Sequence, residues 1–417
     1  MDVRNSRWLV PVLAGALITG GLTLTRPAAP PASAAAVRNV IFINGDGMAA
    51  AHREAARLYY AGLDGRLVMD SLPVSGQLTT SPHDPGSVVT DSAAGASAWA
   101  TGQRTYNGAI SVDVAGNPLP TLGAQAKAAG KATGLVTTAQ VTDASPAAFF
   151  SNSVNRAAQD DIARQYLEVS KPDVILGGGE DWWLPAGSPG AYPDQPAADP
   201  AEGSRGTKGD LIAQARRAGY RYVSTAAQLG SARGGKLLGL FANEELFQQR
   251  PEGQGDVYDP PVSLATMTSK ALSTLGPARH GFFLFVEEEA VDEFAHNNNG
   301  RRTLQAMGEL EKAVTVARDY AATHRDTLVV VTGDHETGGL AVEDPGVTGD
   351  ESGDGVSAED GPFPVKGSGL SFAIDWTTGE HTGQNVPVTA YGPQSGRFTG
   401  QHPNTYVYDV LEPMVTG

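Results

Sequence analysis

Several residues in this sequence have the types and spacing to bind metal ions. His296 follows Asp292 by four residues, so both side chains would share one face of a helix and could bind one divalent ion. Asp334 and His335 come directly after an apolar run and form a second candidate pair. Nitrogen and oxygen ligands without sulfur suit zinc, whereas a site of oxygens alone suits magnesium. Taken alone, the Asp292 and His296 pair is more often an exposed helix pair than a metal site.

Ser92 is a candidate nucleophile. It lies where a β-branched run over 88–90, which we expect to be a strand end, meets a helix of mostly Ala, Gly and Ser. Unpaired N–H groups and the helix dipole favour an anion at a helix N-terminus, so a serine oxygen there could attack an ester or carry a phosphoryl group. A serine at such a junction is more often a helix N-cap. The choice therefore depends on the carboxylates and histidines elsewhere in the chain.

The elements that position these residues alternate between strands and helices. Apolar runs predict strands at 39–44, 132–138, 172–176, 220–223, 236–241, 282–286, 327–332 and 386–391. Helical patterns cover 50–60, 123–129, 152–170, 209–219, 264–275 and 302–323. Such alternation predicts an α/β fold: a single large domain with a mainly parallel central sheet covered by helices on both faces.

Candidate functional residues cluster at the predicted strand ends. In parallel sheets, functional groups gather outside the carboxyl ends of the strands. Five positions follow this rule, namely Asp46, Ser92, Asp143, Glu287 and the Asp334-His335 pair. We therefore expect one shared site.

Composition restricts the class of protein. The chain has 417 residues, 41% hydrophobic and 18% charged, with a net charge of −16 and no cysteine. The acidic balance argues against nucleic-acid binding, which needs a basic surface. Without disulfides, stability must come from core packing and bound metal. The sequence does not distinguish a monomer from a homodimer.

The first 34 residues have the pattern of an export signal. Arg4 and Arg7 precede an apolar run, and small residues at 32–36 suit a signal peptidase. We expect a signal peptide over 1–34, cleaved near 34–36, and a secreted or periplasmic/extracellular domain over 37–417. A retained membrane anchor is the alternative, but the run is only marginally long enough to span a bilayer. We expect no stable membrane association.

Two segments depart from the alternating pattern. Residues 180–208 are rich in Pro and Gly, with Trp182 and Trp183 expected to pack beneath a long surface loop. Residues 341–380 are acidic and rich in Gly, and we expect a small acidic insertion within the domain.

As a set, the motifs resemble those of the alkaline phosphatase family. They occur in the family's order and cover nearly all of residues 39–392. The matching motifs are Gly45-Asp46-Gly47-Met48, Thr90-Asp91-Ser92-Ala93-Ala94, Asp143-Ala144-Ser145-Pro146-Ala147-Ala148, Glu287 with Asp292 and His296, Thr332-Gly333-Asp334-His335-Glu336, and His381-Thr382-Gly383.

The resemblance implies a role for each matching residue. Ser92 would be the nucleophile that becomes a phosphoserine, and Arg156 would bind the phosphate. One Zn²⁺ would be bound by Asp292, His296 and His381. A second Zn²⁺ would be bound by Asp46, Asp334, His335 and the Ser92 oxygen. One Mg²⁺, or another divalent ion in its place, would be bound by Asp46, Asp143, Ser145 and Glu287.

The implied activity is metal-dependent hydrolysis of small-molecule phosphate monoesters. The same architecture also serves phosphodiesterases, sulfatases and phosphoglycerate mutases, so the fold alone does not settle the reaction. A secreted protein that binds metal or phosphate without turnover is the alternative of another class. Intact Ser92 and Arg156 argue against it.

Two positions depart from the family's pattern. Glu288 stands where known members carry Gly, and Glu293 stands where they carry a basic residue or His. Glu293 would then face Asp143 with like charge, which is unfavourable unless a cation lies between them or one carboxylate is protonated. The alternative is a surface orientation of Glu293. His52, His83, His280, His324 and His402 match no motif and are expected to be ordinary surface or core residues.

Overall fold

A ten-stranded sheet runs through the part of the chain that the computed structural model describes, residues 36–192, 203–346 and 359–417. The strands, in sheet order, are β15 (Gly400–Pro403), β2 (Val74–Thr79), β14 (Val386–Tyr391), β8 (Thr327–Thr332), β1 (Asn39–Gly45), β7 (Phe282–Glu288), β3 (Ala132–Gln140), β4 (Val174–Gly178), β6 (Lys236–Leu240) and β5 (Tyr220–Val223). The predicted signal peptide over 1–34 lies outside the described residues and stays a prediction.

The sheet is mainly parallel. Every pair from β8 through β1, β7, β3, β4 and β6 to β5 is parallel, and β14 is antiparallel to both of its neighbours. Register across the centre places Asn44 of β1 opposite both Glu287 of β7 and Thr332 of β8. The carboxyl ends of the central strands therefore meet at one edge, as predicted.

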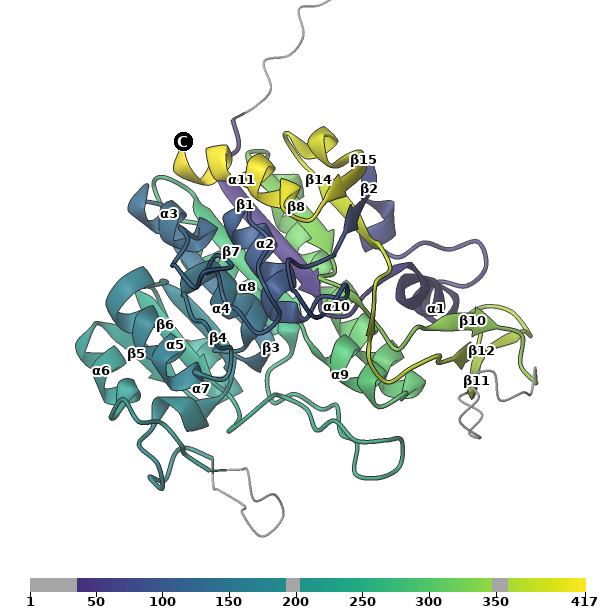
Figure 1. Ribbon diagram of the computed structural model, residues 1–417, viewed down its shortest axis with the longest axis horizontal. Helices are drawn as coiled ribbons and strands as arrows, with labels where there is room; N and C mark the ends of the chain where they lie inside the picture. Colours follow the sequence, from purple (N-terminus) through teal and green to yellow (C-terminus); the bar gives the residue numbers. More distant parts are fainter. Residues whose placement is uncertain (1–35, 193–202, 347–358) are drawn as a thin grey trace, which may run out of the picture. The chain divides into compact units, whose positions relative to one another are not determined.

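Helices cover both faces of the sheet, which confirms the predicted α/β class (Figure 1). The α-helices are α1 (Ala50–Tyr60), α2 (Ser92–Thr101), α3 (Leu122–Ala128), α4 (Ala144–Phe150), α5 (Gln159–Gln165), α6 (Leu211–Arg217), α7 (Ala226–Ser231), α8 (Leu264–Leu275), α9 (Ala290–His296), α10 (Gly300–Thr323) and α11 (Tyr406–Thr416). Short 3₁₀ helices are η1 (Met69–Ser71), η3 (Glu180–Trp183) and η4 (Ser395–Phe398), and η2 (Tyr166–Ser170) is a π-helix. No helix among the described residues is long and apolar enough to cross a membrane.

Two hydrophobic clusters lie on opposite faces of the sheet because side chains alternate along each strand. Ile41 and Ile43 of β1 belong to a cluster with α1, α8, α9 and α10. Val40 and Phe42 belong to a cluster with α2, α3, α4 and α11. Strands buried on both faces read as continuous apolar runs, which is why the sequence predicts them well.

Part of the predicted acidic insertion over 341–380 forms a separate small sheet. Its strands are β10 (Ala341–Glu343), β12 (Ser371–Asp375) and β11 (Asp360–Pro364), all antiparallel. A two-stranded pair, β9 (Glu336–Thr337) with β13 (His381–Thr382), joins the ends of this excursion. Ile374 and Trp376 pack in the same cluster as α10, so the excursion is anchored to the core.

The predicted helix over 152–170 is wrong in its first half. Helix α5 begins only at Gln159, and Arg156 lies in the irregular segment before it. Ser153 pairs with Ile110, and the Arg156 N–H donates to the Gly108 carbonyl, so the segment bonds to another loop. Side chains of Ser153 and Asn155 also bond local backbone N–H groups, which competes with helix formation.

The predicted strand end at 88–90 is also wrong, because this segment is a loop. The side chain of Asn107 takes the place of a neighbouring strand. Its amide donates to the Val89 carbonyl at 2.9 Å and its oxygen accepts from the Asp91 N–H at 3.1 Å. β-branched residues therefore did not identify a strand here.

Candidate active site

Carboxylates lie at the carboxyl ends of the central strands, along one edge of the sheet. Asp46 directly follows β1, Glu287 lies near the end of β7, and Asp334 follows β8 by two residues. All three side chains are buried. Asp143 follows β3 and is the residue immediately before α4. The strand ends thus bring these four predicted residues to a common region.

Ser92 is the first residue of α2 and does not cap it. The cap is Asp91, whose carboxylate accepts the Ala94 N–H at 2.9 Å. The Ser92 hydroxyl is therefore free to face the site, where its Oγ lies 3.2 Å from His335 Nε2. A Cβ on Gly95 would lie 3.2 Å from that of Asp334, so glycine at this position lets α2 pack closely against Asp334.

Asp292, His296 and His381 form a first group of candidate ligands. Their atoms are close: Asp292 Oδ2 lies 3.1 Å from His296 Nε2, and Asp292 Oδ1 lies 3.5 Å from His381 Nε2. The two Nε2 atoms are 3.1 Å apart. Each ring donates its Nδ1 hydrogen to a backbone carbonyl, of Gly379 for His296 and of Thr90 for His381. Both Nε2 lone pairs thus face the same point, an arrangement typical of metal ligands.

Asp46, Asp334 and His335 form a second group. His335 Nε2 lies 3.4 Å from one oxygen of each carboxylate, and the ligating atoms of the three residues lie within 4.8 Å of one another. Asp46 Oδ1 and Asp334 Oδ2 are buried without a hydrogen-bond partner. Such orphaned anionic oxygens fit a divalent cation. The ligating atoms of His335, Asp292 and His381 also lie within 4.8 Å of one another, so the two groups adjoin.

The pKa values of the buried carboxylates also indicate a site for cations. Burial raises the pKa of Asp46 well above its usual value, and the charges of Asp334 and Asp292 add to the effect. Burial likewise raises the pKa of Asp334 to about 7 and that of Glu287 to about 8. Burial acts to raise the pKa of Asp292 too, but the His296 hydrogen bond and neighbouring imidazoles outweigh it and lower that pKa. Carboxylates so close together are stable as anions when cations lie among them.

The third predicted group, the magnesium ligands, is brought together less closely than the other two. Asn44 Nδ2 lies 3.2 Å from Glu287 and 3.5 Å from Ser145 Oγ, so these two residues are near each other. The carboxylate of Asp143 is held by Arg156 at 3.0 Å and contacts the carboxyl of Glu289. Two groups among the described residues bring three ligating atoms within 4.8 Å of one another, and neither includes Asp143 or Glu287: Asp292 with His335 and His381, and Asp46 with Asp334 and His335.

Arg156 is fixed by two carboxylates although it lies in a loop. Its guanidinium lies 3.4 Å from Asp91 and 3.0 Å from Asp143. Burial acts to lower the pKa of Arg156, but the Asp143 and Asp91 charges outweigh it and raise that pKa above its usual value. A permanently charged planar fork, presented to the site in this way, suits recognition of two phosphoryl oxygens.

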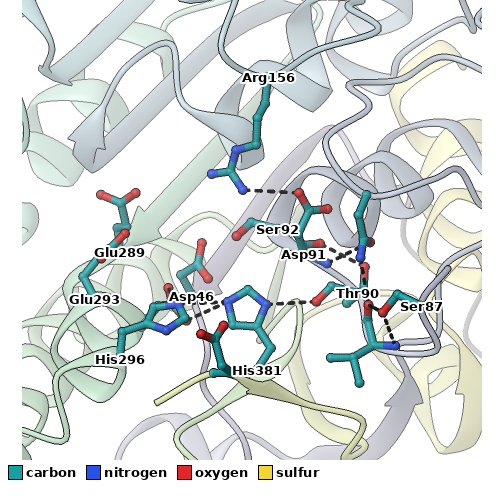
Figure 2. Close-up of a pocket in the computed structure, with 14 residues that line it drawn as sticks. Asp46, Ser87, Thr90, Asp91, Ser92, Arg156, Glu289, Glu293, His296 and His381 are labelled. Atoms are coloured by element: carbon teal, nitrogen blue, oxygen red, sulfur yellow. Dashed lines mark hydrogen bonds and ion pairs between the residues drawn. The ribbon is translucent and has the colours of Figure 1, made fainter. Parts of the chain in front are cut away.

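One cavity of about 430 Å³ is lined by the first ligand group together with Asp46, Ser92 and Arg156. Figure 2 shows Arg156 and Asp91 beside Ser92 from α2, with Glu289, Glu293 and His296 from the α9 side facing them. As predicted, Glu293 meets the like charge of Asp143: burial raises the pKa of Glu293 to about 8, and the Asp143 charge adds to the effect. The carboxyl in direct contact with Asp143 is that of Glu289. Glu293 nevertheless lines the cavity. Glu288 points to the other face, where it accepts hydrogen bonds from Tyr258 and Thr138 at 2.7 Å.

The structure adds residues that the sequence did not single out. Thr337 Oγ1 donates to Asp292 Oδ1 and lies 3.2 Å from His335 Nδ1, so it connects the two ligand groups. Asp91 combines helix capping with contact to Arg156. Glu289 could have been found as the residue two positions after Glu287 on the same face of an extended chain.

The comparisons with known proteins agree with this geometry. A family model described as alkaline phosphatase matches residues 37–365 and 369–416. Streptomycin-6-phosphate phosphatase of Streptomyces griseus is 36% identical over 450 residues, covering 96% of this chain and 95% of that protein. A cold-active alkaline phosphatase structure from Shewanella sp. is 30% identical with a TM-score of 0.72, covering 90% of this chain and 99% of that one. A TAB5 alkaline phosphatase mutant, solved with Mg bound in its M3 site, is 26% identical with a TM-score of 0.70, covering 92% and 98%.

Proposed function

Since this chain belongs to the alkaline phosphatase family and is a phosphatase of phosphate monoesters, we propose that Ser92 is its nucleophile. The Ser92 hydroxyl gives up its proton to water as its oxygen forms a bond to phosphorus, the bond from phosphorus to the alcohol oxygen breaks, and the alcohol leaves with a proton from water. Water then cleaves the phosphoserine and releases inorganic phosphate. The observation that carries this proposal is the position of Ser92 Oγ, 3.2 Å from His335 Nε2 at the edge of the second ligand group.

Residues around Ser92 stabilise the charge that develops in this reaction. The first N–H groups of α2 and its dipole favour negative charge at Ser92. Arg156 donates to two phosphoryl oxygens, and Asp91 and Asp143 hold its guanidinium in the orientation that this requires. Phosphoryl transfer depends mainly on such positioning and charge stabilisation.

The family binds divalent metal ions, and we propose specific ligands here. A zinc ion fits the mixed nitrogen and oxygen donors of Asp292, His296 and His381, and a second fits Asp46, Asp334 and His335 with Ser92. Oxygen donors alone, from Asp46, Asp143, Ser145 and Glu287, fit a magnesium ion. When bound, two such ions stabilise charge on the entering and leaving oxygens and lower the pKa of the nucleophile's hydroxyl.

A comparison of ester classes tests the reaction. Initial rates should be measured on a phosphate monoester, a phosphate diester and a sulfate ester with the same aryl leaving group. We expect the monoester to be hydrolysed fastest. Faster hydrolysis of the diester or the sulfate would assign the chain to another reaction of the same architecture.

Metal analysis tests the ligand assignment. We expect a strong chelator to remove activity and zinc together with magnesium to restore it, with about two zinc ions bound per chain by the proposed ligand groups. The variant His296→Gln should bind one zinc fewer. Full activity in a preparation shown to lack zinc would contradict the proposal.

We also propose export of the chain to a secreted or periplasmic/extracellular location, by a signal peptide over residues 1–34. This rests on the arginines, apolar run and small residues of that segment. Sequencing the N-terminus of protein recovered outside the cytoplasm would test it, with a first residue near 35–37 expected.

A further inference from the structure

The residues that line the cavity wall include more carboxyl groups than the predicted metal-ligand groups contain. Arg156 is the sole Lys or Arg side chain among the described residues that line the cavity, and it is already paired with Asp91 and Asp143. Three further carboxylates line the same cavity and belong to none of the three predicted ligand groups: Glu289, Glu293 and Glu380. These three carboxyl groups therefore face the space that a bound substrate would occupy.

Glu289 shows that this wall lacks a positive partner. Its side chain is only 5% exposed, and its Oε2 is buried without a hydrogen-bond partner. Its nearest charged contact is another carboxyl, that of Asp143. Burial and the Asp143 charge raise the pKa of Glu289 well above its usual value, so its ionised form is costly unless a cation approaches it.

The reaction geometry places the leaving alcohol on this acidic wall. In an in-line displacement, the entering and leaving oxygens lie on opposite sides of phosphorus. Ser92 enters from α2, and across the cavity stands α9 with Glu293 (Figure 2). Glu380, next to His381 in the sequence, lines the same cavity. Neither Glu293 nor Glu380 uses its carboxylate in a hydrogen bond or ion pair with another described residue that would neutralise it. The alcohol part of the ester therefore meets two carboxyl groups that no Lys or Arg of the described residues pairs with.

We propose that this enzyme prefers phosphate monoesters whose alcohol carries a positive charge, such as an ammonium or guanidinium group, and that Glu293 and Glu380 bind that charge. The inference rests on the proposed function, because the direction of attack by Ser92 sets the position of the alcohol. Esters whose alcohol is anionic are disfavoured by the same two carboxylates. Glu293 is half-buried and Glu380 is exposed, so Glu293 contributes more to the preference.

Two substrates of nearly the same shape but different charge test this preference. Phosphocholine and 3,3-dimethylbutyl phosphate differ in a quaternary nitrogen against a quaternary carbon. Each available carboxylate should favour the charged ester by about two- to fivefold in kcat/KM, the range for exposed ion pairs, so the two together should give about tenfold at low salt. Added sodium chloride should reduce the ratio because it screens exposed charges.

Variants assign the effect to the two residues. Glu293→Gln and Glu380→Gln should each lower the ratio of the two kcat/KM values, and the double variant should bring it near one. Glu412→Gln on α11, outside the cavity, should leave the ratio at the wild-type value. Because Glu380 is exposed, its variant also gives a result free of folding defects.

The outcomes separate this inference from the proposed function. A wild-type ratio near one at low salt, or a ratio unchanged in the double variant, would overturn the preference for cationic alcohols while hydrolysis of both esters upheld the phosphatase. Absence of hydrolysis of either ester would instead contradict the proposed function.

Discussion

Gly47 is the position where one methyl group should do most damage to the ligand groups. It adopts φ +67, and a Cβ there would lie 2.7 Å from both Asp292 Oδ1 and Thr337 Oγ1. Ordinary contact begins at 3.4 Å, so the two oxygens would have to move by about 0.7 Å. Metal–ligand distances tolerate only about 0.2 Å. Gly47→Ala should therefore weaken zinc binding at the first group, by about 10- to 100-fold on the scale of disturbed ligand support.

The control for this substitution is Gly219→Ala. Gly219 has φ +89 but no atom within 4 Å of an added Cβ, so it reports backbone strain without a clash. Left-handed strain costs about 1–2 kcal/mol for either variant. Zinc retained per chain should be measured by elemental analysis after dialysis against graded chelator, alongside urea unfolding. If Gly47→Ala kept zinc as tightly as Gly219→Ala did, the clash with Asp292 would have no bearing on the metal site.

Three further predictions follow from the same contacts. Arg156→Lys should lower kcat/KM for a monoester about 10- to 100-fold, matching about 1.5–3 kcal/mol for one charged hydrogen bond; unchanged kinetics would remove Arg156 from phosphate binding. In chelator-treated protein the free energy of unfolding should fall as pH rises from 6.5 to about 9, because the folded-state pKa of His296 is raised from 6.5 to about 9 and that of buried Glu287 from 4.5 to about 8. Urea titrations across that range would detect the fall, and a rise would refute it. Asp91→Ala and Thr121→Ala each remove a helix cap worth about 1 kcal/mol, yet only Asp91→Ala should also reduce kcat/KM; equal activity in both would exclude a role for Asp91 in orienting Arg156.

Elements buried on regular faces could be predicted from the sequence. Helix α8 has the expected bounds at 264–275, and β8 those at 327–332, because their apolar residues repeat with the period of the element. Strand β15, at one edge of the sheet, and its neighbour β2 were not predicted, since few of their side chains are buried and their residues lack such a pattern. Burial thus decides which elements the sequence reveals.

The residues of the candidate site also differ in how well the sequence predicts them. Residues at strand ends, such as Asp46 and Asp334, could be placed from topology because parallel strands end at one edge. Arg156 could not, since its loop is held by long-range bonds to Gly108 and to two carboxylates. Thr337 acts through contacts between elements distant in sequence, which no local pattern records.

Trapping the phosphoenzyme tests the central claim most directly. Protein incubated with a labelled monoester and quenched in acid should carry one phosphoryl group, which peptide mass spectrometry should locate on Ser92. Ser92→Ala should carry none while keeping most of its bound zinc, because the serine is one ligand among several. Phosphoryl label on another residue, or label that persists in Ser92→Ala, would contradict the account.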